Sequence, residues 1–249
     1  MTRVRARIVC LPSAGGAAAA YRPWVPVLPR GVELSAVELP GHGTRAATKP
    51  EEHAELIAGP TGRELAPLAA TAPLVLFGHS TGALLAYETA RRLCAGGTPP
   101  SVLVLAGLCP ADRLDRKANG VLAERPDLLT AHLGQLGNPP PGVPAAPRPR
   151  TAELHAARAD RRILANAPAP AAPLDLPLLA LAGRHDPLHP PPSMAQWQRL
   201  TRRWLGLHVL PGDHFFPWQS SEVPRLLSDV TLLVSGSGTA ARHPLLVAN

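Results

Sequence analysis

A serine lies between two glycines in the stretch LFGHSTGALLAYETARRL, residues 76–93. Gly78, Ser80 and Gly82 form a G-x-S-x-G pattern that follows a short apolar run and precedes a helical one. This pattern is typical of a nucleophile elbow, a tight strand-to-helix turn that holds a serine hydroxyl out at the carboxyl edge of a sheet. Side chains at 78 and 82 would collide with the strand and the helix. The alternative interpretation is a tight turn whose serine only caps the helix.

A serine hydroxyl is a poor nucleophile near neutral pH, so it needs a base and an acid that orients this base. After a nucleophile elbow the expected chain order is Ser, acid, His. We favour His214 as the base, because LPGDHFF places it just after the last predicted strand. We favour Asp186 as the acid, because AGRHDPLHP places it in the loop after the preceding strand. Alternatively, Asp186 is only a turn residue before Pro187.

An oxyanion formed at Ser80 would need two backbone N–H donors. The amide of Thr81 lies at the N-terminus of the predicted helix, where such donors point outward. The second donor is expected in the loop LPSAGG, residues 11–16, whose glycines permit close approach of the backbone. We favour the amide of Ala14, with Gly15 as the alternative. Without Ser80, this loop would be interpreted as an ordinary flexible turn.

The elements that must position these residues follow from the apolar pattern. Short apolar runs predict strands at 5–11, 32–39, 73–78, 101–107, 176–183 and 205–212. Helical patterns lie between them, at 17–28, 50–70, 81–97 and 193–204. This alternation predicts the α/β class, with a mostly parallel sheet flanked by helices.

One long segment interrupts the alternation. No strand is predicted over residues 110–172, which carry many prolines and a helical pattern at 151–167. We interpret 110–172 as a helical lid insertion with a mobile proline-rich section, inserted into a core of residues 1–109 and 173–235. Residues 236–249 are expected to be a disordered tail. In the lid, the residues expected to govern substrate access are Leu133, Leu136, Arg158 and Arg162.

Charge, aromatic content, apolar runs and cysteines argue against several classes of protein. The 249 residues carry a formal net charge of +7, but the arginines are scattered and aromatic residues are only 4%, which argues against nucleic-acid binding and leaves an acidic protein partner. No apolar run is long enough to cross a membrane, and the N-terminal apolar run is too short for a signal peptide. Three cysteines without metal-site spacing predict reduced, buried thiols and a cytoplasmic protein.

Five motifs together resemble the type II (editing) thioesterases of polyketide and nonribosomal peptide synthetase pathways, which belong to the α/β-hydrolase superfamily. The similar stretches are LPSAGGAAAAYRPW, VELPGHGTR, FGHSTGALLAYETA, AARADRRILANAPAPAAPLDLPLLALAGRHDPLHPP and LPGDHFF. They occur in the family's order over about residues 5–218. The resemblance implies an α/β-hydrolase fold and a free-standing enzyme. It implies hydrolysis of acyl thioesters carried on the phosphopantetheine arm of an acyl or peptidyl carrier protein. Ser80, Asp186 and His214 then form the catalytic triad, and the amides of Ala14 and Thr81 form the oxyanion hole.

Further expectations follow from the resemblance. No metal or cofactor is expected, because the phosphopantetheine belongs to the carrier partner, and the chain is expected to be a monomer. Thioesterase domains fused to synthetases commonly place the acid after the strand that follows the nucleophile helix, but here Ala106 and Gly107 stand there. The chain also departs from the family pattern at Ser13, where His is usual, at Thr81, where Met is usual, and at His42, where Arg is frequent.

Three interpretations remain beside carrier-linked hydrolysis. The chain could be a generic α/β-hydrolase esterase, an acyltransferase, or a non-catalytic carrier-binding protein. The sequence does not identify the acyl group. The arginines of the lid are expected to include part of a docking face for an acidic carrier. The alternative is that they belong to a solvated charged helix. They are Arg148, Arg150, Arg158, Arg161 and Arg162.

Overall fold

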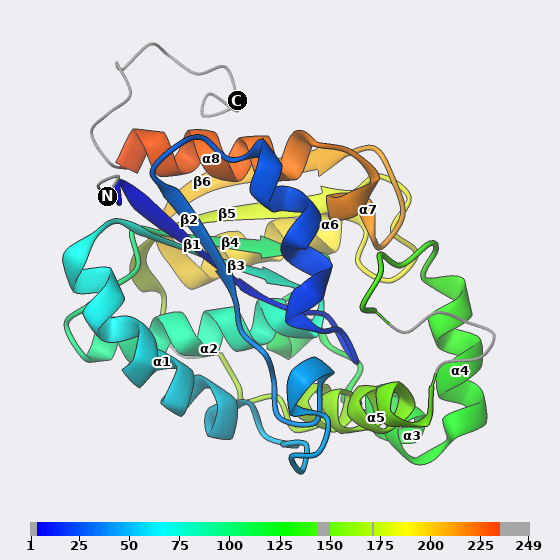
Figure 1. The fold of residues 1–249 in the computed structure, drawn as a ribbon. Helices are drawn as coiled ribbons and strands as arrows, with labels where there is room; N and C mark the ends of the chain where they lie inside the picture. The colour runs from blue at the N-terminus through cyan, green and yellow to red at the C-terminus, as the bar shows by residue number, and fades with distance from the viewer. Residues whose placement is uncertain (1–3, 144–149, 171, 235–249) are drawn as a thin grey trace.

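The computed structural model describes residues 4–143, 150–170 and 172–234 (Figure 1). Six strands form one sheet in the order β2-β1-β3-β4-β5-β6, and each neighbouring pair is parallel. Their bounds are β1 (Ala6–Leu11), β2 (Val32–Ala36), β3 (Leu74–His79), β4 (Val102–Ala106), β5 (Leu174–Gly183) and β6 (Thr201–Leu210). All six predicted strands are present. Because they are parallel, their carboxyl ends meet at one edge of the sheet.

Helices cover both faces of the sheet, as the near-continuous apolar strands predict. Successive side chains of β1 alternate between two cores, with Ile8 and Cys10 in one and Val9 and Leu11 in the other. The first core is covered by η1 (Ala18–Val27) and α8 (Glu222–Val234), and the second by α1 (Ala54–Thr71) and α2 (Thr81–Ala95) (Figure 1). The predicted α/β architecture is therefore confirmed.

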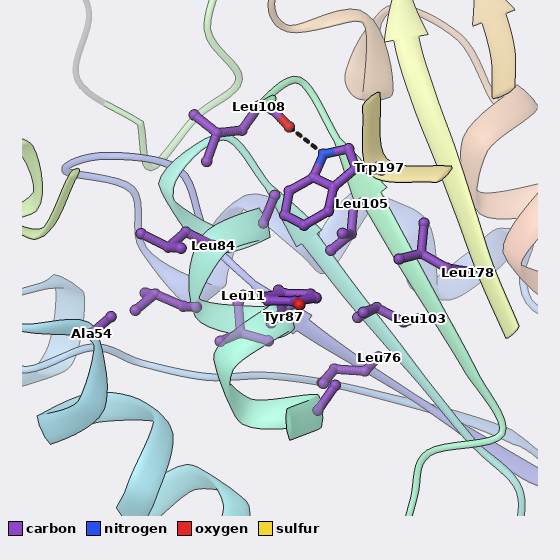
Figure 2. Close-up of a cluster of buried hydrophobic side chains, with 14 of the residues drawn as sticks. Leu11, Ala54, Leu76, Leu84, Tyr87, Leu103, Leu105, Leu108, Leu178 and Trp197 are labelled. Atoms are coloured by element: carbon purple, nitrogen blue, oxygen red, sulfur yellow. Dashed lines mark hydrogen bonds between the residues drawn. The ribbon is translucent and has the colours of Figure 1, made fainter. Parts of the chain in front are cut away.

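The core beneath α2 also fixes a loop beside the candidate site. Figure 2 shows Tyr87 of α2 and Trp197 packed against leucines of the sheet. The indole Nε1 of Trp197 donates a hydrogen bond of 2.6 Å to the carbonyl oxygen of Leu108. Since Leu108 follows β4, this bond anchors the loop at the carboxyl edge of the sheet.

The segment between β4 and β5, residues 110–172, is called the insertion below. Its helices are α3 (Arg116–Glu124), α4 (Pro126–Gln135) and α5 (Thr151–Ala165), which lie together beyond the carboxyl ends of the strands (Figure 1). The expected mobile section includes residues 144–149, and the expected disordered tail spans 236–249; both lie outside the described residues. Short elements complete the fold: η2 (Gly43–Arg45), η3 (Ala111–Arg113), α6 (Pro191–Met194), η4 (Ala195–Leu200) and α7 (Phe216–Gln219).

Two predicted helices differ from the structure. The pattern at 193–204 gives only α6 and η4, and its last residues begin β6 at Thr201. Arg202 and Arg203 are exposed there because β6 is an edge strand, and their polarity imitates the outer face of a helix. The pattern at 17–28 forms a 3₁₀ helix with Pro23 and Pro26 inside it, since proline lacks the N–H that an α-helix requires.

Within the described part of the chain, no helix has both the length and the apolar character required to cross a membrane.

Candidate active site

The turn between β3 and α2 holds Ser80 in a strained backbone conformation. Ser80 has φ 54° and ψ −126°, and among the described residues other than glycine it alone has a positive φ. Its amide donates to the carbonyl of Ala106 over 2.8 Å. A Cβ at Gly78 would collide with the backbone of Gly82, as the sequence predicts. A Cβ at Gly82, however, would collide with the carbonyl of Leu11. The missing side chain at 82 therefore lets the end of β1, rather than β3, approach α2 closely.

The structure brings Ser80, His214 and Asp186 together from three loops at the same edge of the sheet. The Ser80 hydroxyl donates to His214 Nε2 over 3.0 Å, and His214 Nδ1 donates to Asp186 Oδ2 over 2.9 Å. All three side chains are buried. These hydrogen bonds require the imidazole tautomer with its proton on Nδ1, which leaves Nε2 free to accept the serine proton. This geometry can activate a serine as a nucleophile.

Asp186 is held in its ionised form by several donors. Burial by itself would raise the pKa of Asp186, but the hydrogen bond and charge of His214 and the amides of Leu188 and His189 outweigh burial and lower this pKa to about 2. The neighbouring Asp213 is engaged elsewhere, since its carboxylate accepts from the amides of Phe215 and Asn138. Asp186 is therefore the carboxylate that can stabilise an imidazolium at His214.

Two backbone amides are available for an oxyanion. Thr81 is the first residue of α2, so its amide has no partner within the helix. In the loop after β1, the Gly15 amide donates to Asp160 Oδ2 over 2.7 Å, and the Gly16 amide donates to the Ser13 carbonyl. No described group accepts from the amide of Ala14. Of the two alternatives in this loop, the contacts therefore favour Ala14 over Gly15.

His79 is a residue of the site that sequence reasoning missed. It precedes Ser80, is fully buried, and its Nε2 donates to the carbonyl of His214 over 2.8 Å. Burial and, next, the charge of His214 lower the pKa of His79 to about 3, so its ring stays neutral. The bond holds the backbone of His214 in place. A histidine inside an otherwise apolar strand, directly before the serine, was the available signal.

A second polar cluster, also missed, connects the insertion to the loops of the sheet. Asp160 of α5 accepts from the Gly15 amide and from His42 Nε2, the latter over 2.8 Å, and His42 Nδ1 donates to the Pro40 carbonyl. Burial would lower the pKa of His42, but the charge and hydrogen bond of Asp160 outweigh it and raise this pKa to about 9. His42 is thus an imidazolium at neutral pH. Asp160 thereby joins α5 both to this imidazolium and to the loop that carries Ala14.

A cavity of about 550 Å³, called the chamber below, lies between the insertion and the loops after β4 and β5. Leu108, Leu188 and His189 line it, and the His189 ring lies 6.1 Å from the His214 ring, centroid to centroid. Burial and, next, the charge of His214 lower the pKa of His189 to about 3. The chamber therefore adjoins the Ser80–His214–Asp186 cluster.

The predicted lid residues fall into two groups. Leu133 and Leu136 are buried in one apolar cluster with Phe215, the residue after His214. Arg158 and Arg162 do not line the chamber. Arg158 donates to the Ala123 carbonyl, and Arg162 bonds to two carboxylates; both border a separate hollow of about 190 Å³.

Of the five arginines among which part of a docking face was expected, those that the structure describes differ in exposure. Arg161 is buried at 5% exposure and lines the chamber, so it is unavailable to a surface partner. Arg162 is neutralised by Glu52 and Glu124. Arg150 is exposed, whereas Arg148 lies outside the described residues. Charge along a helix did not reveal which positions the tertiary structure covers.

The chain is similar to known proteins over most of its length. The family model described as "Thioesterase domain" matches residues 6–232. The gramicidin S biosynthesis protein GrsT of Aneurinibacillus migulanus is 28% identical over 217 residues, covering 86% of this chain and 84% of GrsT. Thioesterase PikA5 of Streptomyces venezuelae is 31% identical over 240 residues, covering 94% of this chain and 84% of PikA5.

A solved structure shares the fold. The RedJ thioesterase from the prodiginine biosynthetic pathway of Streptomyces coelicolor has a TM-score of 0.77 to this chain and 31% sequence identity. The match covers 92% of this chain and 85% of that one.

Proposed function

Since this chain belongs to the thioesterase domain family, we propose that it is a type II, editing thioesterase that hydrolyses acyl groups from the phosphopantetheine arm of a carrier protein. One observation carries this proposal: Ser80, His214 and Asp186 are hydrogen-bonded in series at the carboxyl edge of the sheet. The relatives GrsT and PikA5 support the pathway class, since their names refer to gramicidin S biosynthesis and to a thioesterase.

The position of the acid supports the editing type. Asp186 follows β5, and no carboxylate stands at Ala106 or Gly107 after β4. A Cβ at Gly107 would lie 3.1 Å from His79 Nε2 and 3.5 Å from His214 Cε1, so a larger side chain there would press on the base. In the proposed enzyme the acid is therefore supplied from the loop after β5.

In the acylation half, His214 Nε2 takes the proton of Ser80, and Ser80 Oγ bonds to the thioester carbonyl carbon. The amides of Thr81 and Ala14 stabilise the resulting oxyanion. The carbon–sulfur bond then breaks, and His214 passes its proton to the carrier's thiol. An acyl group remains on Ser80, and Asp186 stabilises the transient imidazolium.

In the deacylation half, His214 takes a proton from water and the hydroxyl bonds to the acyl carbonyl carbon. The bond to Ser80 Oγ breaks, the proton returns to that oxygen, and the free acid leaves. Every step is assigned to side chains and amides of this chain and to water. We propose no metal or cofactor of the chain's own, because the phosphopantetheine arrives on the carrier.

The carrier is proposed as an acidic partner on the basis of charge. The chain has a formal net charge of +7, and attraction between opposite charges raises the rate of encounter. Among the insertion arginines, Arg150 is open to a partner, with 87% of its side chain exposed.

The experiment compares hydrolysis of an acyl group on a carrier protein with hydrolysis of the same group on a small thiol. Ser80→Ala is the control for both. We expect Ser80-dependent turnover, with a higher kcat/KM for the carrier-bound substrate because only the carrier makes surface contacts. A generic esterase would hydrolyse small thioesters and esters without preferring the carrier. A carrier-binding protein without catalysis would turn over neither, and a serine-reactive fluorophosphonate would leave its Ser80 unlabelled.

A further inference from the structure

The chamber contains a buried cation. Its wall is largely apolar, with Leu108, Leu114, Leu122, Leu164 and Leu188 among the lining residues. Arg161 of α5 also lines it and is only 5% exposed. A charged side chain in an apolar wall is unfavourable unless a partner of opposite charge compensates it.

Among the described residues, no carboxylate forms a hydrogen bond or an ion pair with this guanidinium. Arg161 Nη1 donates to the neutral amide oxygen of Asn119 over 3.2 Å, and the buried Nε has no hydrogen-bond partner among the described residues. Asp160, the adjacent carboxylate, forms no hydrogen bond with Arg161: its Oδ2 accepts from Gly15 and His42, and its buried Oδ1 has no partner among the described residues. Burial lowers the pKa of Arg161, and the charge of Asp160 raises it, so this pKa falls only to about 10 and the guanidinium is charged at neutral pH.

No other described side chain of the chamber forms an ion pair with Arg161, and the second arginine that lines the chamber, Arg113, is paired with Asp112. Burial and, next, the charge of Arg161 lower the pKa of His132 to about 4, so its ring is neutral, and its buried Nε2 has no partner among the described residues. His189 accepts from the Cys109 amide at Nδ1, so its proton lies on Nε2, where it can donate. Asp115 borders the chamber, but its carboxylate caps α3 by accepting from the Ala118 amide.

We propose that the chamber binds an acyl group that ends in a free carboxylate, and that Arg161 pairs with this carboxylate while Ser80 attacks the thioester at the other end. This inference rests on the proposed function and names its substrate class. A carboxylate would accept from the unpartnered Nε of Arg161, and its intervening methylene groups would pack against the leucines. The volume of about 550 Å³ falls within the range of small-molecule sites. A plain hydrocarbon chain would leave the guanidinium unpaired.

The test uses one carrier protein loaded with matched acyl groups. Malonyl, succinyl and glutaryl groups are compared with propionyl, butyryl and pentanoyl groups, and kcat/KM is measured for each. All six substrates share the same carrier. Contacts between the carrier and the protein surface therefore cancel when kcat/KM of a dicarboxylic group is divided by kcat/KM of its neutral counterpart. We expect at least one dicarboxylic group to exceed its neutral counterpart by roughly tenfold or more, since a buried charge-assisted hydrogen bond is strong. A 3-hydroxybutyryl group, which is polar but uncharged, should not share this advantage.

Arg161→Met removes the charge but keeps a long side chain, and it should reverse the preference in favour of the neutral groups. Replacement of an uncompensated buried charge by an apolar side chain is tolerated by folding. Arg161→Lys keeps the charge without the planar fork and should give an intermediate ratio. Arg202→Met, in the exposed part of β6, is the matched control for net charge and should leave the ratio unchanged.

Several results would overturn the inference. One is a parent enzyme that prefers the neutral group at every chain length. Another is an Arg161→Met variant that keeps the parental ratio of kcat/KM between dicarboxylic and neutral groups. A third is a parent enzyme that prefers the 3-hydroxybutyryl group over all three dicarboxylic groups. If the parent hydrolyses no acyl-carrier, the proposed function fails separately. The carboxylate site is then judged by calorimetric binding of glutarate, which should be saturable in the parent and lost in Arg161→Met.

Discussion

Two neighbouring regions of the molecule bury polar side chains, and the partners of those side chains differ. At the carboxyl edge of the sheet, Ser80, His214 and Asp186 are hydrogen-bonded in series. The second carboxylate oxygen of Asp186 accepts hydrogen bonds from two backbone amides. In the adjoining chamber, Arg161 and His132 each keep a buried nitrogen without a partner among the described residues.

The difference indicates two kinds of site. The three side chains of the first region are oriented before a substrate arrives, so little reorganisation is needed during a reaction, although His79 Nδ1 and Thr81 Oγ1 beside them also lack a partner among the described residues. Buried polar groups without partners are rare in folded proteins, because each loses its hydrogen bonds to water. Such groups at a cavity indicate that a ligand completes them. We therefore expect the first region to carry out the reaction and the second to determine which acyl group reacts.

The largest effect is expected from Ser80→Ala. The variant should lower kcat by roughly 10⁴-fold or more, because no acyl-enzyme can form. Its free energy of unfolding should stay close to that of the parent, since the turn is fixed by Gly78 and Gly82 rather than by the hydroxyl. Steady-state kinetics and urea unfolding check the two parts. Turnover comparable to the parent would contradict the role of Ser80.

The next effect concerns the acid. Asp186→Asn should lower kcat by roughly 10³-fold, because the amide no longer favours the Nδ1-protonated tautomer or stabilises the imidazolium. Asp213→Asn is the matched control, since Asp213 lies beside His214 but accepts from Phe215 and Asn138. Its effect on kcat should be much smaller. Equal losses in the two variants would indicate that the assignment of Asp186 is wrong.

The turn between β3 and α2 requires that residue 82 has no side chain. Gly82→Ala would push a Cβ into the carbonyl of Leu11, so the free energy of unfolding should fall by about 3 kcal/mol. Gly59→Ala in α1 is the control, because its Cβ would meet only the ends of two arginine side chains, Arg63 Nη1 at 3.8 Å and Arg92 Nη1 at 4.0 Å. That variant should be neutral or more stable by up to about 1 kcal/mol. Denaturant unfolding distinguishes the two, and similar stabilities would refute the close approach at Gly82.

The His42–Asp160 pair predicts a dependence of stability on pH. The pKa of His42 rises from about 6.5 in the unfolded chain to about 9 in the folded one. The pair's contribution, about 3 kcal/mol, is therefore complete below about pH 6.5 and is lost as the pH rises through about 9. Asp160→Asn should remove this dependence and also lower kcat, because the Gly15 amide beside Ala14 then donates to an uncharged and weaker acceptor. Urea unfolding at about pH 6 and about pH 10 provides the measurement; an identical pH profile in the variant would contradict the assignment.

The smallest effect sharpens the comparison between adjacent arginines. Arg162 bonds to Glu52 and Glu124 at the surface of α5, whereas Arg161 faces the chamber. Arg162→Met should change stability only slightly, because water screens surface ion pairs. It should leave the preference between dicarboxylic and neutral acyl groups unchanged. A shift in preference as large as that expected of Arg161→Met would mean that the chamber does not separate the two residues.

Much of the architecture followed from local pattern. The six apolar runs predicted the strands, and the order Ser80, Asp186, His214 predicted the cluster, because parallel strands bring their carboxyl ends to one edge. The predicted boundary between helix and strand was less accurate near Thr201. The predicted helix ended at 204, but β6 begins at Thr201, because the first residues of this edge strand are as polar as the outer face of a helix. The fold is that of the α/β-hydrolases, as its structural relatives also show.

The sequence by itself determined the elements and the residues that can react, because strand periodicity, turn chemistry and the G-x-S-x-G pattern are local properties of the chain. Only the tertiary structure decided which polar groups meet. His42 and Asp160 are 118 positions apart, and Arg161 and Asn119 are 42 apart. Neither pair has a local signature, because the partner of a buried charge is set by how helices pack on the sheet. For the same reason, Arg161 was expected at a docking surface and is instead buried in the chamber wall.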